Sequence, residues 1–412
     1  MLRDDVWENE LDRWFAPFSE ALGNKVRRKW APIYLRGLIA PGERKSVTVM
    51  ADRVAVGDAP QLHHFVAASN WDTEPLEEVL LGKVAGLVGG AGSHIIVDDT
   101  ALPKKGTESV GVAHQYCGAL GKQANCQSMV SVTWARDEVP APIALRLYLP
   151  KEWVDSVERR RTGGIPDGLG FRPKWRIALD EIERIQKSLD DDMFDDVLAD
   201  AGYGMCAEFR RGLDELGLSW VVGILSTQNV YSRDVQLDDT PPARGRPRRY
   251  PRSEEVPRSA RDAIASLGAE AFRSVAWRRG TKGTLRGDFV AVCVRVADGP
   301  RASRGVHPPG REAWLVCERR SASEQKYYLS NYPANTSLKK LASLIKARWS
   351  CEQAHQQMKE EFGLDHFEGR SWQGLHHHAL LTMVAFAFHQ HLRLRENKVS
   401  AQSARRLVAG DP

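Results

Sequence analysis

The sequence predicts an α/β protein with a mixed sheet, a helical N-terminal domain and a β-rich insertion. Three observations lead to this fold class. Helical periodicity fills the first 90 residues, short β-branched runs then alternate with helical segments, and a strand-rich segment precedes a final pair of helices. Strands that alternate with helices are typical of α/β folds.

Length and composition agree with this class. The chain has 412 residues, of which 42% are hydrophobic and 27% charged, enough for two or three globular domains. The longest apolar run, around 379–388, is about half the roughly 20 residues that span a bilayer, and the acidic N-terminus lacks a signal-peptide pattern. Six cysteines form no C-x-x-C pair, so neither a zinc site nor a disulfide framework is predicted. We therefore expect a cytoplasmic protein.

Residues 1–90 are predicted to form the helical domain. The expected helices cover Trp7–Phe18, Lys25–Leu38, Arg44–Val56, Pro60–Ala68 and Pro75–Val88. Basic residues cluster at the start of the second helix and within the third: Lys25, Arg27, Arg28, Lys29, Arg44, Lys45 and Arg53. Such clusters indicate either a solvated face or the binding of DNA ends, and both interpretations stay open.

Two strands of the predicted core end in carboxylates. The run His94–Val97 is followed by Asp98 and Asp99, and Asp196–Ala199 is followed by Asp200. Other expected elements are strands at Gln127–Trp134, Ile143–Leu149 and Trp220–Leu225, a surface loop at Lys151–Lys174, and helices at Trp175–Leu189 and from 204 to about Leu216. Ligands collect at the carboxyl ends of strands in such sheets, so we expect a site there.

Residues 226–333 are predicted to be an inserted, basic, mostly β subdomain. Residues 225–326 hold 20 Lys/Arg against 12 Asp/Glu, a net charge of +8 in a chain whose total is +5. This excess predicts a surface for a polyanion. Trp277 lies beside Arg278 and Arg279, and is either a core aromatic or a ring on which an unpaired base stacks.

A predicted helix from Leu338 to about Phe362 carries three charged residues. Arg348, Glu352 and Lys359 fall within about 60° of one helical stripe. A solvated face would explain an ordinary helix of this kind. A helical glutamate together with two strand-borne aspartates instead suits a divalent metal, because Mg²⁺ takes hard oxygen ligands. A last helix from Trp372 to about Leu394 is expected to carry His376, His377 and His378 on its surface rather than in a metal site.

These motifs resemble the DDE transposases of bacterial insertion sequences, most of all the insertion sequence 701 family of the cut-and-paste group. They are Asp-Asp-Thr at 98–100, Ala-Asp-Ala-Gly-Tyr-Gly at 199–204, and Arg348-x3-Glu352-x6-Lys359. The residues around Lys104-Lys105-Gly106 and at 363–370 are also similar to that family. Ile345 stands where the group's Tyr-x2-Arg-x3-Glu-x6-Lys signature has tyrosine, so that hydroxyl is absent or moved.

The resemblance implies an RNase H-like core that cuts and joins DNA strands with Mg²⁺, for which Mn²⁺ substitutes. It implies Asp99, Asp200 and Glu352 as catalytic metal ligands; Asp98 is the alternative to Asp99, and the Asp-Thr pairing of related transposases favours Asp99. It also implies that double-stranded DNA is the partner, bound by a homodimer at the bacterial nucleoid. Two Mg²⁺ ions would activate the attacking water and neutralise phosphate charge.

The residues expected to contact DNA are Arg348, Lys359, Lys104, Lys105, Arg244, Arg246, Arg248, Arg249, Arg252, Trp277, Arg278 and Arg279. The expected domains are 1–90 (helical, DNA-binding), 91–225 (first part of the catalytic core), 226–333 (insertion), 334–396 (last part of the core and C-terminal helices) and 397–412 (flexible tail). Two other functions are open. One is a transposase-derived DNA-binding protein that does not cut, and the other is a metal-dependent phosphatase.

Overall fold

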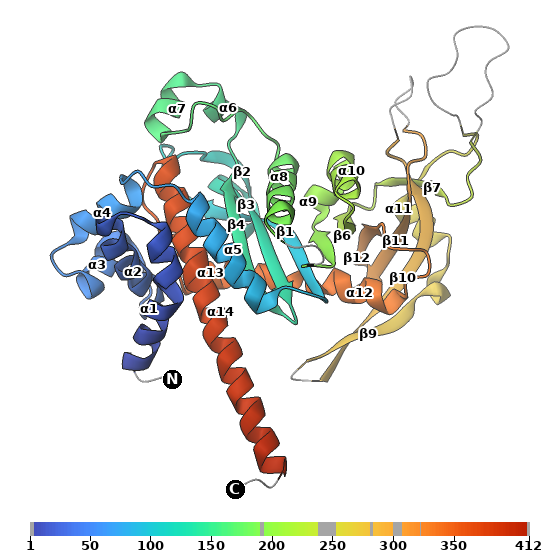
Figure 1. Ribbon diagram of the computed structural model, residues 1–412. Coiled ribbons are helices and arrows are strands. Elements are labelled where there is room, and N and C mark those ends of the chain that lie inside the picture. Colours follow the sequence, from blue (N-terminus) through green and yellow to red (C-terminus); the bar gives the residue numbers. More distant parts are fainter. Residues whose placement is uncertain are drawn as a thin grey trace. The chain divides into compact units, whose positions relative to one another are not determined.

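The computed structural model describes residues 4–189, 193–237, 253–280, 283–299, 307–321 and 323–409 (Figure 1). The chain divides into two compact units. The first comprises Met1–Phe194 and Ser350–Pro412, and the second comprises Asp195–Trp349. This division differs from the expected domains, because the N-terminal helices and part of the catalytic core belong to the same unit.

The N-terminal helices of the first unit agree with the sequence periodicity. They are α1 (Asp4–Ala21), α2 (Lys25–Ile39), α3 (Val47–Val54), α4 (Ala59–Ala67) and α5 (Glu74–Val88). Their buried faces include Phe15, Phe18, Tyr34 and Phe65. Figure 1 shows these helices packed beside α14 (Trp372–Ala409). This helix continues through most of the segment that was expected to be a flexible tail.

The sheet of the first unit is antiparallel. Its strands are β1 (Ser93–Pro103), β2 (Ala113–Cys117), β3 (Lys122–Arg136) and β4 (Val139–Leu147). One side of β3 pairs with β1, and its other side pairs with β2 and then with β4. β4 includes Pro140 and Pro142. Proline is tolerated there because β4 pairs only with β3 among the described strands.

Two predictions of secondary structure are wrong. The expected loop at Lys151–Lys174 contains two short helices, α6 (Lys151–Val154) and α7 (Val157–Gly163), before α8 (Lys174–Ser188). The expected helix from Leu338 to Phe362 is divided between α12 (Leu338–Ala347) and α13 (Trp349–Glu360). Arg348 caps the end of α12 and is not part of the helix that carries Glu352.

The second unit contains a mixed sheet. In chain order its elements are β5 (Asp196–Ala199), α9 (Ala201–Gly204), α10 (Ala207–Glu215), β6 (Ser219–Ile224), β7 (Asn229–Ser232), β8 (Arg258–Ser259), α11 (Ala260–Ala265), β9 (Arg273–Gly280), β10 (Gly283–Val296), β11 (Glu312–Arg319), β12 (Gln325–Ser330) and α12. β5 is parallel to β6, and the sheet continues through β12, β11, β10, β7 and β8. The strands expected in an insertion therefore extend the core strand β6 directly. The predicted α/β class with a mixed sheet is confirmed.

Among the described residues, no helix is long and apolar enough to cross a membrane.

A buried ion network joins the N-terminal helices to the sheet of the first unit. Arg146 on β4 donates from Nη1 to Glu77 Oε1 on α5 at 2.7 Å, and from Nε to Glu181 Oε1 on α8 at 2.7 Å. Glu77 is 4% exposed. Burial opposes ionisation of this carboxyl, but the hydrogen bonds and charge of Arg146 outweigh burial and hold the pKa of Glu77 below its usual range.

We expect Glu77→Gln to lower the free energy of unfolding at neutral pH by about 3 kcal/mol, because it breaks a buried ion pair. A carboxyl whose pKa is depressed in the folded state stabilises the protein above its unfolded pKa, near 4.3, and this stabilisation is lost as the pH falls through the folded value. The difference between wild type and variant should therefore shrink as the pH falls below about 4. Urea unfolding of wild type and Glu77→Gln at several pH values measures this difference in the free energy of unfolding. Glu78→Gln, at an exposed neighbouring position, is the control. A difference that does not change with pH would contradict the assignment.

Candidate catalytic site

Asp98 and Asp99 lie in the middle of β1 rather than at its end, and they point to opposite faces of the sheet. The strand continues to Pro103, so the sequence prediction of a strand ending at these aspartates is wrong. Asp98 is paired with Ser131 of β3, and Asp99 with Val130. Successive side chains of a strand alternate between faces, so Asp98 shares a face with Ser131 and Asp99 lies on the other.

The helix that carries Glu352 packs on the face of Asp98. His355 Nε2 lies 2.8 Å from Ser131 Oγ, and Cys351 Sγ lies 3.3 Å from Thr133 Oγ1. All four residues are buried. Ser131 and Thr133 are two residues apart on β3 and share one face, so these contacts fix α13 on that face.

Glu352 and Lys359 occupy one side of α13. Seven residues separate them, which places them within about 20° around the helix axis. Glu352 is exposed and Lys359 is half-buried. Burial lowers the pKa of the Lys359 ammonium, and the negative charge of Asp365 opposes that effect.

Asp99 is held on the opposite face by a residue that the sequence analysis missed. Lys174, the first residue of α8, donates from Nζ to Asp99 Oδ2 at 2.6 Å and to Ser128 Oγ at 2.8 Å. About a third of each side chain in this ion pair is exposed. The sequence offers no signal for this contact, because 75 residues separate the two partners. Lys174 is also the last residue of the segment that the sequence predicts to be a surface loop.

Asp200 directly follows β5, as predicted, and its side chain caps α9. Its carboxylate accepts hydrogen bonds from the backbone N–H groups of Gly202 at 2.9 Å and Tyr203 at 3.3 Å. The turn packs closely on β6: a Cβ added at Gly204 would lie 1.9 Å from the carbonyl oxygen of Gly223. Glycine at 204 therefore lets the backbone after Asp200 approach the sheet.

The residues expected to contact DNA differ in how far they are exposed to solvent. Lys104 is half-buried and donates from Nζ to the carbonyl of Phe367 at 2.9 Å, whereas Lys105 is exposed. Burial lowers the pKa of Lys104. The arginines 244, 246, 248, 249 and 252 lie outside the described residues.

The aromatic residue of the expected insertion is packed. Trp277 on β9 lies edge-to-face with Phe289, with ring centroids 6.1 Å apart, and Lys346 Nζ lies 4.9 Å from its ring centroid. The Arg278 guanidinium lies 5.6 Å from the ring centroid of Trp349, and Arg279 is exposed. Trp277 therefore packs against a core aromatic ring and also lies beside the Lys346 ammonium.

The histidine run is buried, so the prediction that it lies on the helix surface is wrong. His377 Nε2 contacts the carbonyl of Trp71 at 2.9 Å, and His378 Nδ1 contacts the Tyr34 hydroxyl at 2.8 Å. Burial lowers the pKa of His376, His377 and His378 to about 4. His377 and His378 fasten α14 to the helical domain, whereas His376 Nε2 lies 3.4 Å from the backbone N of Leu147 on β4.

Comparison with known proteins identifies the family. Residues 17–284 match the family described as DDE superfamily endonuclease. The chain belongs to this endonuclease superfamily. The matched range includes Asp98, Asp99 and Asp200 and ends before α13. The chain is also 31% identical over 224 residues to a protein of Microchaete diplosiphon described as the probable transposase for insertion sequence element IS701. That alignment covers 54% of this chain, and the chain spans about half the length of the relative (54%).

The donor set of this endonuclease suits Mg²⁺. Carboxylates supply hard oxygen atoms, and the buried His355 and Cys351 beneath Glu352 are engaged with Ser131 and Thr133. In the part of the chain that the structure describes, no group of three His, Cys, Asp or Glu side chains is gathered closely enough to hold a metal ion. Asp98 and Glu352 belong to the first unit, whereas Asp200 belongs to the second.

We expect Gly204→Ala to destabilise the endonuclease by about 1–3 kcal/mol, because the new methyl group would meet a backbone carbonyl that has no rotamer to change. Gly82→Ala in α5 is the matched control, since no atom lies within 4 Å of its added Cβ and alanine favours helix. Urea unfolding of both variants measures the difference. Equal stability of Gly204→Ala and wild type would show that the close approach does not constrain the Asp200 turn.

Proposed function

We propose that this endonuclease is a DNA transposase that binds the ends of an insertion sequence, cuts the strands there and joins them to a target. Asp98, Asp200 and Glu352 are the proposed ligands of Mg²⁺, and Asp99 is the alternative to Asp98. The observation that carries this proposal is the packing of α13 on the face of β1 and β3 to which Asp98 belongs.

The choice of Asp98 rests on the two faces of β1. The Asp-Thr pairing alone favours Asp99. However, an oxygen of Asp99 lies 2.6 Å from the Lys174 ammonium, on the face away from α13. An ammonium there repels a second cation, and a carboxylate on that face points away from the helix that carries Glu352. Asp98 lies on the face that α13 covers.

Each remaining charged residue has a role that its chemistry suits. Two bound Mg²⁺ ions would activate the attacking water and stabilise the leaving oxygen. The carboxylates hold the ions. Lys359 binds a DNA phosphate as a point charge, and Arg348 binds a DNA phosphate through two parallel hydrogen bonds of its guanidinium. Arg244, Arg246, Arg248, Arg249 and Arg252 are proposed to add phosphate contacts.

The proposed partner is double-stranded DNA at the transposon ends and at the target. The name of the relative supports this partner, because a transposase of an insertion sequence acts on DNA. We propose that residues 1–90 bind the ends, that two copies assemble on the DNA, and that the protein works at the bacterial nucleoid. A phosphatase is less well supported, because Asp98 and Asp99 lie on opposite faces and cannot act on one phosphoryl group together.

The test is Mg²⁺-dependent nicking of a supercoiled plasmid that carries the DNA flanking the gene. We expect Asp98→Asn, Asp200→Asn and Glu352→Gln each to reduce the nicking rate by about a thousandfold or more, because each removes a metal ligand. Asp99→Asn should instead lower the stability by about 1 kcal/mol, since it breaks a partly exposed ion pair, and should retain most of the activity.

The reverse pattern, with Asp99→Asn inactive and Asp98→Asn active, would return the ligand role to Asp99. DNA binding without nicking by the wild-type chain would favour a DNA-binding protein that does not cut. Nicking that is independent of all four carboxylates would contradict the proposed site.

Lys359 provides a second test, since a phosphate-binding cation and a metal ligand respond differently to salt. Lys359→Ala should weaken assembly with DNA at moderate salt and recover cleavage at low salt, where the remaining charge contacts strengthen. Glu352→Gln should not recover at any salt concentration. Gel-shift and nicking assays at several salt concentrations measure both effects. Equal, salt-independent losses in both variants would place Lys359 in the chemical step.

A further inference from the structure

We propose that Tyr328 of β12 contacts the substrate of this endonuclease: its hydroxyl donates a hydrogen bond to an oxygen of the phosphate that is cut, beside Arg348. This inference rests on the proposed function and deepens it, because it names a further residue that holds the substrate. Tyr328 belongs to the second unit, as do Arg348 and the proposed metal ligand Asp200.

The register of β12 places the Tyr328 side chain on the face of the sheet that the Asp200 turn crosses. Tyr328 is paired with Gly223 of the antiparallel strand β6. Directly opposed residues of two such strands share a face. A Cβ added at Gly223 would lie 2.9 Å from the backbone N of Ala201 and 3.1 Å from the carbonyl carbon of Asp200. The Tyr328 ring and the turn after Asp200 therefore lie on one face of this sheet.

A buried carboxylate gathers hydrogen-bond donors on the same face. Glu318 of β11 is 3% exposed. It accepts hydrogen bonds from Lys346 Nζ of α12, from Arg320 Nε at 3.2 Å and from the Tyr328 hydroxyl at 3.3 Å. Val316 is paired with Tyr328 across β11 and β12, so Glu318, two residues farther along β11, shares the face of Tyr328. Glu318 thus positions the hydroxyl and two cations together.

The Tyr328 hydroxyl is held loosely enough to change its acceptor. Its distance of 3.3 Å to Glu318 is long for a hydrogen bond between a hydroxyl and a carboxylate, which is typically about 2.5–2.7 Å. A hydroxyl turns about its C–O bond, so it can exchange Glu318 for a phosphate oxygen while Lys346 still neutralises Glu318. Burial raises the pKa of Tyr328, and the charge of Glu318 raises it further, so the hydroxyl keeps its proton and acts as a donor.

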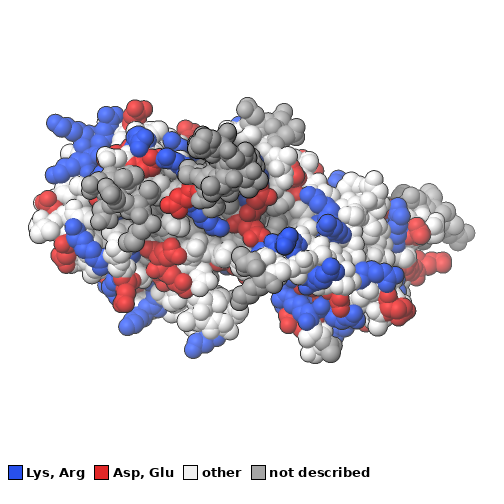
Figure 2. Space-filling model, turned by 90° about the horizontal axis from the view of Figure 1, so that it is seen from below, with Lys and Arg blue, Asp and Glu red and all other residues white. Residues whose placement is uncertain are grey.

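The surroundings of this hydroxyl carry an excess of positive charge. Arg348 is close enough for its charge to oppose the effect of burial on the pKa of Tyr328. Arg348, Arg320 and Lys346 are three cations against the one carboxylate of Glu318, which leaves a net charge of +2. Figure 2 shows Lys and Arg side chains, with some Asp and Glu among them, gathered where Figure 1 places α12, β9 and β10. Such a surface attracts the phosphates of DNA.

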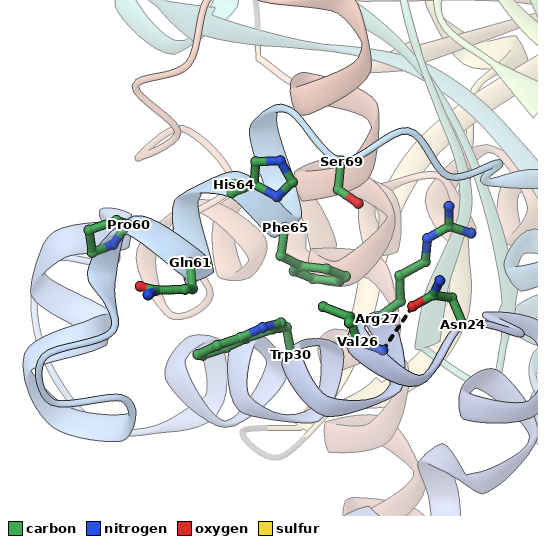
Figure 3. Close-up of a pocket in the computed structure, with 9 residues that line it drawn as sticks. All are labelled: Asn24, Val26, Arg27, Trp30, Pro60, Gln61, His64, Phe65 and Ser69. Carbon is green, nitrogen blue, oxygen red and sulfur yellow. Dashed lines mark hydrogen bonds between the residues drawn. The ribbon is translucent and has the colours of Figure 1, made fainter.

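A groove in the first unit is not the place of this phosphate. It lies between α2 and α4 and has a volume of about 460 Å³ (Figure 3). Figure 3 shows the rings of Trp30 and Phe65 between the two helices. The described residues that line the groove are Asn24, Val26, Arg27, Trp30, Pro60, Gln61, His64, Phe65 and Ser69. No proposed metal ligand is among them, whereas the face of Tyr328 includes the turn that follows Asp200.

The experiment measures Mg²⁺-dependent nicking, by the full chain, of duplex oligonucleotides that carry the DNA flanking the gene. Tyr328→Phe removes the hydroxyl and keeps the ring. We expect it to lower the nicking rate by about tenfold to a hundredfold, the range for a hydrogen bond to a charged group. Tyr327→Phe is the matched control. Its hydroxyl donates to Gln325 Oε1 at 2.6 Å on the opposite face of β12, so its removal should leave the nicking rate unchanged.

A phosphorothioate at the cut distinguishes a substrate contact from a structural effect. Each of its two stereoisomers replaces one non-bridging oxygen by sulfur, which is a weak hydrogen-bond acceptor. With one isomer, the ratio of the wild-type rate to the Tyr328→Phe rate should fall toward one, because both proteins then lack the contact. With the other isomer the ratio should stay as it is with ordinary DNA. A structural effect would give the same ratio with all three substrates.

The outcomes separate this inference from the proposed function. If the wild-type chain nicks the DNA and Tyr328→Phe nicks it equally fast, or loses activity by the same factor on all three substrates, the contact of Tyr328 is overturned and the transposase proposal stands. If the wild-type chain does not nick the DNA, the proposed cleavage and the role of Tyr328 are both overturned.

Discussion

The packing of α13 on β3 is the constraint on which the candidate site depends. A helix that carries one metal ligand can act with a strand that carries another only if the two are held in a fixed register. The contacts of His355 with Ser131 and of Cys351 with Thr133 provide this register, because all four groups are buried. A slide of one helical turn, about 5.4 Å, would leave these groups without their partners, at a cost of about 1–3 kcal/mol for each.

Because side chains alternate along a strand, the adjacent residues Asp98 and Asp99 lie on opposite faces of β1 and have different surroundings. Asp98 lies on the face that α13 covers, and Asp99 lies on the face where α8 supplies Lys174. Two neighbouring carboxylates on one face would repel each other and share a single environment. On opposite faces, Asp99 is paired with the Lys174 ammonium, and Asp98 lies on the face that α13 covers.

The sequence predicts local periodicity well and long-range pairing poorly. The five N-terminal helices and the position of Asp200 after β5 follow from short patterns, and the structure confirms them. β1 extends past Asp98 and Asp99 because β3 continues to pair with it, which no local pattern reports. The sequence predicts the three histidines of α14 on the helix surface, but backbone carbonyls and the Tyr34 hydroxyl satisfy their ring nitrogens in the core. The Lys174–Asp99 pair could not be predicted, since only the fold brings its partners together.

The first unit also contains the N-terminal helices that are proposed to bind the DNA ends, and this has a mechanical consequence. α4 packs against α14, whose buried histidines fasten it to the helical domain, and Arg146 ties α5 to β4. β4 is paired with β3, and β3 is paired with the strand that carries Asp98. Because every step of this chain of contacts is buried or hydrogen-bonded, DNA held by these helices would stand at a fixed distance from Asp98 and Glu352. The packing of the first unit would then fix two of the three proposed metal ligands relative to the bound DNA, and the second unit would supply Asp200.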